Sequence, residues 1–192
     1  RLSYLPHHAK ADLFTQYAKP WPERTVGALL TGSLNPEHYP LRCRVAELIQ
    51  AGKINAEILP HPGTRLAGSD TCLRQEIEYA KALGDARCSI VCSSKWRYGL
   101  AKYVESAMAG CLVIGDTHAD ADNDCPGPVV TIDKWMSDKL LAAAVNHVVE
   151  QSAEPDGLLE HLSWNACHWT RQQRDVGCYA EKLTSLMRQY IE

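Results

Sequence analysis

The segment from Lys95 to Asp116 carries residue types suited to binding a nucleoside diphosphate. Two cations, Lys95 and Arg97, precede Gly99, and apolar residues at helical spacing follow it. Free backbone amides at a helix start, together with the positive end of the helix dipole, bind phosphate groups. We therefore expect the amide of Gly99 to face a phosphate, and Lys95 and Arg97 to neutralise a diphosphate as it leaves.

Glu105 lies in the second turn of this predicted helix, where its carboxylate is placed to accept two hydrogen bonds from a ribose diol. Tyr98, Lys102 and Tyr103 lie near it in the sequence, and we take them as further candidates for nucleotide binding. The pattern alone favours an ordinary helix packed on a sheet, with Lys102 and Glu105 on its solvated face.

A second group of candidates precedes this segment. Gly32 and Ser33 follow a buried strand pattern, Arg42 lies early in the next predicted helix, and His61 follows the next predicted strand. A glycine lets a ligand approach the backbone closely, and His61 is a candidate to contact a base or a sugar. For Gly32, Ser33 and Arg42, a place near the donor phosphates is what the family resemblance described below implies. A plain turn, a surface arginine and a solvated histidine are the alternatives that remain open.

Short apolar strands alternating with longer helical patterns predict the elements that position these residues. They imply parallel strands joined by crossover helices, with ligands bound beyond the carboxyl ends of the strands. The predicted fold class is thus α/β: a Rossmann-like parallel sheet of about five strands flanked by helices, with C-terminal helices packing back on the domain. We expect strands at 25–31, 56–59, 88–92, 111–115 and 128–132, and helices at 9–17, 40–52, 70–84, 100–109, 137–150 and, with a break near 177, 158–191.

The composition is that of an ordinary globular protein. The 192 residues are 45% hydrophobic and carry a formal net charge of -3. No basic excess indicates a nucleic-acid partner, and no apolar run reaches the roughly 20 residues that span a bilayer. We expect a lead-in at 1–24, a donor-binding domain at 25–155 and terminal helices at 156–192. The chain shows no targeting signal, which suits a cytoplasmic location, and begins at Arg1, as a piece of a longer protein would.

Metal and disulfide chemistry find little support in the sequence. The eight cysteines include no C-x-x-C pair, and most lie within strand or helix patterns, so we expect buried free thiols. A zinc site from His161, Cys167 and His168 lacks the usual ligand spacing. The acidic segment 116–126 lacks the later Glu and the fixed Gly of a calcium loop, and we interpret it as a solvated loop. We expect no metal and no cofactor beyond a donor substrate.

The stretch KYVESAMAGCLVIGD, from Lys102 to Asp116, resembles the donor-site helix of the group 1 glycosyltransferases, particularly their CgeB-like branch. The motifs YPLR at 39–42 and HPG at 61–63 agree in order, and the resemblance covers roughly 25–150. It implies the C-terminal, nucleotide-sugar-binding domain of a GT-B glycosyltransferase, with Glu105 on the ribose, the Gly32 loop near the phosphates, and no obligatory metal. It also implies transfer of a sugar to a glycan or other hydroxyl acceptor, with the acceptor held by an N-terminal domain or a partner chain.

One departure from the family pattern bears on mechanism. Many retaining members carry an E-x7-E pair, but Arg97 stands eight residues before Glu105. The stereochemical outcome and the sugar therefore stay open, and a catalytically inactive interaction module is the alternative. Two other Rossmann-type functions fit less well. An epimerase needs a glycine fingerprint that is missing here, although Tyr98 and Lys102 have its Tyr-x-x-x-Lys spacing, and a receiver needs an Asp where Cys92 ends the third strand.

Overall fold

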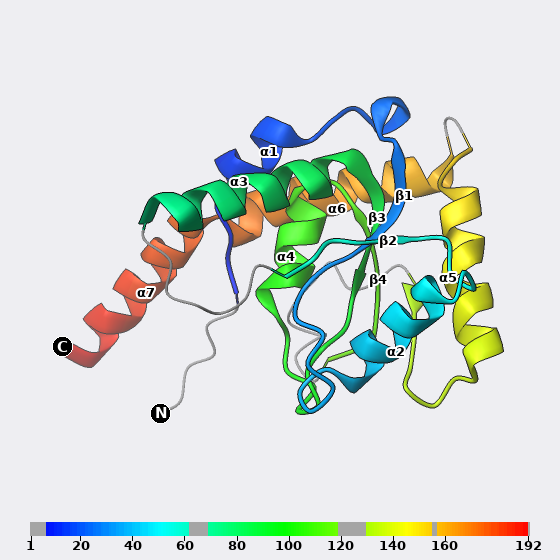
Figure 1. The fold of residues 1–192 in the computed structure, drawn as a ribbon. Coiled ribbons are helices and arrows are strands. Elements are labelled where there is room, and N and C mark those ends of the chain that lie inside the picture. Colours follow the sequence, from blue (N-terminus) through cyan, green and yellow to red (C-terminus); the bar gives the residue numbers. More distant parts are fainter. Residues whose placement is uncertain (1–6, 62–68, 119–129, 155–156, 192) are drawn as a thin grey trace.

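A computed structural model of the chain describes residues 7–61, 69–118, 130–154 and 157–191. Its centre is a five-stranded, all-parallel sheet with the strand order β2-β1-β3-β4-β5 (Figure 1). The predicted Rossmann-like α/β fold is confirmed. The strands are β1 (Val26–Leu30), β2 (Glu57–Ile58), β3 (Ala86–Val91), β4 (Leu112–Gly115) and β5 (Val130–Thr131).

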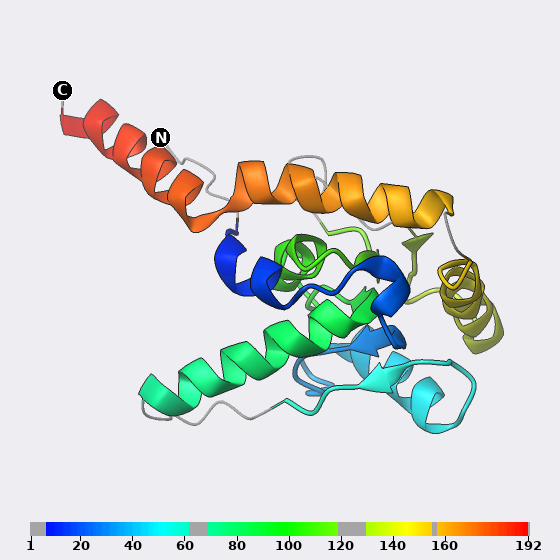
Figure 2. The ribbon, with the colours of Figure 1, turned by 90° about the horizontal axis from the view of Figure 1, so that it is seen from above.

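Helices cover both faces of this sheet. One face packs against α2 (Pro40–Gln50) and α5 (Asp138–Gln151) around a core that includes Leu30, Ile90 and Ile114. The other face packs against α3 (Ser69–Asp85) and α4 (Ala101–Met108), and α1 (Ala11–Tyr17) lies against α3 and α4. Figure 2 shows this layered arrangement from above. Because both faces are covered, strands β1 and β4 are apolar throughout rather than alternating.

The strand register brings the predicted site loops to one edge of the sheet. Leu30 lies opposite both Ile58 and Ile90, Ile90 lies opposite Ile114, and Ile114 lies opposite Val130. This row marks the carboxyl ends of the strands, so the segments that follow each strand lie side by side at this edge. Parallel sheets bind their ligands there.

The opposite, amino edge is closed by Arg24. This buried side chain donates hydrogen bonds to the main-chain oxygens of Ala86, Ala109 and Gly110, at 2.7 to 2.9 Å. It follows the short 3-10 helix η1 (Trp21–Glu23), so it ties the lead-in to the starts of β3 and β4.

The two C-terminal helices differ in how they relate to the body. Helix α6 (Leu158–Arg174) packs back against α4 and β4, as predicted. Helix α7 (Val176–Ile191) follows a break at Asp175 and extends away from the sheet (Figures 1 and 2). No helix in the described part of the chain combines the length and apolarity needed to cross a bilayer.

Some helix boundaries differ from those predicted. Helix α3 begins at Ser69, so Asp70 lies inside the helix and is not its N-cap. It also runs past Gly84, which we expected to end it. A Cβ at Gly84 would lie 2.1 Å from the carbonyl oxygen of Tyr17. This glycine therefore permits close approach of the α1 backbone rather than ending the helix.

Of the seven cysteines in the described part of the chain, Cys88, Cys92, Cys111 and Cys167 are buried, whereas Cys72 is exposed and Cys43 and Cys178 are half-buried. Burial raises the pKa of Cys88 to about 11 and that of Cys111 to about 12. These two thiols stay protonated at neutral pH and act as packing groups, as expected. Cys125 and most of the acidic segment 116–126 lie outside the described residues.

Candidate functional site

A cavity of about 360 Å³ opens at the carboxyl ends of β1 and β2, beside α3 and α4. We call it the Gly32 cavity; its lining includes Thr31, Gly32, His61, Tyr79 and Lys102. The cavity lies beside the boundary between β1 and β3. The chain leaves β1 for α2 on one face of the sheet, and it leaves β3 for α4 on the other face. In doubly wound sheets this topological switch point is where ligands bind.

Gly32 makes this crowded position possible. Its φ is +103°, a conformation that side chains other than glycine rarely adopt. A Cβ there would lie 2.8 Å from Nη1 of Arg42 and 3.1 Å from Cε of Lys102. The adjoining hydroxyl of Thr31 is buried and makes no hydrogen bond of normal geometry, although the Tyr79 phenol is its neighbour. The glycine therefore lets the Arg42 and Lys102 side chains pack directly against the main chain at the end of β1.

Lys102 supplies the cavity with a positive charge. Its ammonium lies 4.3 Å from the centre of the Tyr79 ring, and it makes no ion pair with any described residue. Burial, with a smaller contribution from the nearby Arg42 charge, lowers the pKa of Lys102, while Glu105 acts in the opposite direction. Burial and the charges of Lys102 and Arg42 likewise lower the pKa of His61. An anionic ligand beside Lys102 would offset the cost of burying its ammonium, although the carboxylates of Glu76 and Glu78 also line this cavity.

Glu105 is held by a tyrosine that sequence reasoning missed. The Tyr79 hydroxyl donates a hydrogen bond of 3.0 Å to Oε2 of Glu105. Burial and the Glu105 carboxylate raise the pKa of Tyr79 well above its ordinary value, so the phenol remains a donor. Glu105 lines a second cavity, of about 190 Å³, together with His8 and Lys10. Tyr79 lines both cavities. It therefore links Glu105, the residue predicted to bind the ribose, to the Gly32 cavity.

Arg42 is buried at the switch point, with 1% of its surface exposed. Its Nη1 donates to the carbonyl oxygen of Ser33 at 3.1 Å, and its Nη2 donates to that of Cys92 at 2.7 Å. The guanidinium also lies 4.1 Å from the centre of the Tyr39 ring. These contacts join the loops that follow β1 and β3, and they place the side chain's terminal donors on the main chain rather than in the cavity.

The predicted cations Lys95 and Arg97 line a third cavity, of about 120 Å³, beyond the ends of β3 and β4. We call it the Asp116 cavity. Lys95 lies 3.6 Å from a carboxylate oxygen of Glu37, and Arg97 donates to the carbonyl oxygen of Thr117 at 3.1 Å. Arg97 also has a φ of +56°, in the left-handed region. The structure therefore separates these cations from the cavity that Glu105 lines.

Asp116 is an ordered carboxylate, in contrast to the solvated loop residue that we predicted. It accepts hydrogen bonds from the Ser93 amide at 2.6 Å, from the Ser93 hydroxyl, and from the Tyr103 hydroxyl at 3.0 Å. Its position directly after the buried strand β4 is the signal that would have identified it. Tyr103, predicted to contact the nucleotide, is buried beneath this carboxylate, Tyr98 is exposed, and Gly99 is buried.

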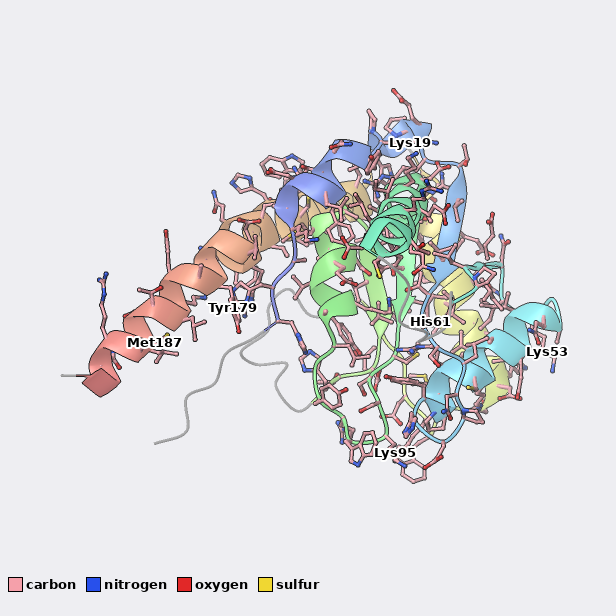
Figure 3. All side chains as sticks on the ribbon, turned by 60° about the vertical axis from the view of Figure 1, so that its left-hand side comes forward. Lys19, Lys53, His61, Lys95, Tyr179 and Met187 are labelled. Atoms are coloured by element: carbon pink, nitrogen blue, oxygen red, sulfur yellow. The ribbon has the colours of Figure 1, made fainter. Side chains whose placement is uncertain are left out.

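The predicted residues thus gather at one edge of the sheet but in three neighbouring places. Gly32, His61 and Lys102 share one cavity, Glu105 lies in the next, and Lys95 and Arg97 line the third. Figure 3 shows Lys95 at the end of the molecule opposite Lys19, with His61 between them. Among the described residues, no group of three or more His, Cys, Asp or Glu side chains is arranged to hold a metal ion.

Comparisons with known proteins support the fold. No protein-family model and no curated protein matches the sequence. A solved structure described as "Crystal structure of GtfA/B complex" matches with a TM-score of 0.51 at 15% sequence identity. The match covers 84% of this chain and 35% of that one, so the chain spans about a third of its structural neighbour. The likeness is one of fold: the chain shares the architecture of part of that structure.

Proposed function

We propose that this chain binds a nucleotide-diphosphate sugar at the carboxyl edge of its sheet and contributes the donor site of a GT-B type glycosyltransferase. The observation that carries the proposal is the Gly32 cavity. There the Lys102 ammonium has no ion-pair partner among the described residues, and the Lys102 side chain packs beside the positive-φ Gly32. Such a site suits a phosphate group, because a compact cation complements its charge.

The diphosphate is assigned to Gly32 and Lys102, with His61 at the rim of the same cavity. We assign the ribose to Glu105, because Tyr79 occupies one of its carboxylate oxygens and leaves the other as an acceptor. Arg42 contributes positive potential and holds the switch-point loops together. Electrostatic stabilisation of a departing diphosphate by fixed cations is a general route to catalysis of group transfer.

Transfer to an acceptor hydroxyl requires groups beyond this donor site. We propose that an acceptor-binding domain or a partner chain supplies them. Two findings support this part: the chain spans about a third of its structural neighbour, and that neighbour is described as a complex.

A non-catalytic interaction module is the second candidate. The observation that favours it is Arg97, which stands where many retaining relatives of the resembled family carry an acidic residue, and whose guanidinium bonds to the main chain. The donor-site proposal and the interaction module are both compatible with the fold. They differ in that only the donor-site proposal requires the chain to bind a nucleotide.

The test is calorimetric titration of the chain with UDP, GDP, CDP, TDP and their sugars, alongside Glu105→Ala and the control Glu47→Ala, an exposed glutamate on α2. We expect the nucleotides of one base to bind the wild type and the Glu47→Ala control with equal affinity. The same nucleotides should bind Glu105→Ala at least about tenfold more weakly. Absence of binding by every nucleotide, with and without an added partner domain, would favour the interaction module.

A further inference from the structure

The Asp116 cavity has an exposed aromatic side chain at its rim that the proposed donor site does not explain. Trp135 is 83% exposed and lines this cavity with Asp116, Asp133 and Lys134. Tryptophan is enriched in binding surfaces relative to the rest of a protein surface.

The loop that presents Trp135 is firmly held. The Trp135 amide donates a 2.8 Å hydrogen bond to a carboxylate oxygen of Asp133. Arg44 donates to the carbonyl oxygens of Lys134 and Met136, at 3.0 and 2.6 Å. The indole is therefore displayed by an ordered turn, so a ligand that stacks on it pays little ordering entropy. The Lys134 ammonium lies 4.8 Å from the ring centre on one side, and the high exposure leaves room on the other.

The polar lining of this cavity is rich in hydrogen-bond acceptors. An ionised carboxylate offers about four lone-pair sites. Asp116 uses two of them for the amide and hydroxyl of Ser93, and its carboxylate shares the single hydroxyl proton of Tyr103 with the main-chain oxygen of Asp116, which lies 2.9 Å from that hydroxyl. At least one site therefore remains for a ligand donor, on a carboxylate that these bonds hold in place. Asp133 adds a second carboxylate, of which one oxygen bonds the Trp135 amide.

The charged lining of this cavity is balanced. The cations Lys95, Arg97 and Lys134 are matched by Asp116 and Asp133 and by Glu37, which lies 3.6 Å from Lys95. A neutral polyhydroxyl ligand suits a balanced lining, and the two carboxylates accept hydrogen bonds from its hydroxyls.

We propose that the Asp116 cavity is a saccharide subsite, in which a pyranose stacks on Trp135 and donates hydroxyl hydrogen bonds to Asp116 and Asp133. The C–H groups on a pyranose face are complementary to an indole face, and its equatorial hydroxyls reach carboxylates beside the ring. Binding of the saccharide stands independently of the proposed donor site. Its role, as the sugar of the donor or as the acceptor, rests on the proposed function.

The experiment is saturation-transfer NMR and titration with methyl glycosides of glucose, galactose, mannose and N-acetylglucosamine. The variants are Trp135→Ala, the conservative Trp135→Phe and Asp133→Asn. Trp164→Ala is the matched control, because Trp164 is also exposed, at 60%, but lies beside Gly110, at the amino edge of the sheet. Far-ultraviolet circular dichroism of each variant checks that the fold is retained.

We expect at least one glycoside to bind the wild type and the control equally, with binding at least about tenfold weaker in Trp135→Ala and largely restored in Trp135→Phe. No glycoside binding, an equal loss in Trp164→Ala, or displacement of the glycoside by inorganic phosphate alone would overturn the proposal.

Parallel titrations with a nucleoside diphosphate and its sugar separate this result from the donor-site proposal. If Trp135→Ala weakens the nucleotide sugar but not the bare nucleotide, the saccharide is that of the donor; if it weakens only the glycoside, the saccharide is the acceptor. If no nucleotide binds while a glycoside does, the donor-site proposal fails and the subsite stands.

Discussion

The phenol of Tyr79 on α3 donates a 3.0 Å hydrogen bond to the Glu105 carboxylate on α4, and the same ring lies 4.3 Å from the Lys102 ammonium. The Tyr79 side chain therefore orients Glu105, which we propose binds the ribose, and packs against Lys102, which we propose binds the phosphate. Lys102 and Glu105 both lie on α4, three residues apart, so the packing of α3 against α4 is what brings Tyr79 into contact with both of them.

Replacing Tyr79 with Phe should weaken nucleotide binding while leaving the fold intact. The ring and its contact with Lys102 remain, but Glu105 loses its hydrogen-bond donor. We expect a loss of about 1 kcal/mol, or roughly fivefold in the dissociation constant, by calorimetry. Tyr17→Phe, which also retains a cation–π contact, with Lys81, is the control. An unchanged affinity in Tyr79→Phe would show that the hydroxyl plays no part in binding.

Replacing Lys102 with Met should weaken nucleotide binding. Loss of the ammonium should weaken nucleotide binding by about 10- to 100-fold, because hydrogen bonds to charged groups are strong. Lys53→Met, at an exposed lysine in the turn after α2, should bind as the wild type does. A Lys102→Met protein that binds normally would place the phosphates elsewhere.

The same Lys102→Met variant makes a prediction about pH. Burial lowers the pKa of Lys102 in the folded chain, so the unfolded chain binds this proton more tightly. The charged lysine therefore costs stability at neutral pH, and wild-type stability should rise relative to Lys102→Met as pH increases from the lowered pKa to the ordinary value of 10.5. Urea denaturation across this range measures the difference, and a constant difference would contradict the prediction.

Replacing Gly32 with Ala should destabilise the fold. The left-handed backbone costs about 1–2 kcal/mol, and contact with Arg42 and Lys102 adds about 1–3 kcal/mol. Gly52→Ala is the matched control, because Gly52 also has a positive φ but a Cβ there meets no atom within 4 Å. Chemical denaturation should show the larger loss at Gly32. Equal losses would mean that Arg42 and Lys102 move aside at little cost.

Asp175 should make the link between the lead-in and the C-terminal helices sensitive to acid. One carboxylate oxygen accepts from the Ala11 amide at 2.9 Å, and the other accepts from the Gly177 amide at 3.0 Å. The Ala11 bond is the main cause that lowers the pKa of Asp175 below its ordinary 3.8. Its stabilisation is thus fully present above pH 3.8 and is lost as pH falls through the lowered pKa.

Asp175→Asn resembles the protonated form, so it should be less stable than the wild type at neutral pH by about 1 kcal/mol. This gap should close in strong acid, whereas Asp12→Asn, at an exposed aspartate of α1, should show no comparable gap. Thermal unfolding from acid to neutral pH provides the measurement, and a gap that persists in acid would rule out the carboxylate as its source.

The sequence by itself determined the alternation of strands and helices and the edge of the sheet where the candidate residues lie. Apolar runs such as that of β4 have one plausible environment, a sheet covered on both faces, and the loops after parallel strands must then share an edge. The order of strands was not predicted. The strand order depends on which position in the sheet each helical connection leads to, and the local hydrophobic periodicity of the sequence does not specify that position.

Only the tertiary structure decided which candidates share a cavity. Lys95 and Arg97 precede Glu105 by a few residues, yet α4 directs Glu105 toward α3 while the cations stay at the ends of β3 and β4. Tyr79 lies 26 residues from Glu105, and no spacing rule connects them. Contacts between side chains on neighbouring helices arise from packing between elements distant in the sequence, so they become visible only when the chain is folded.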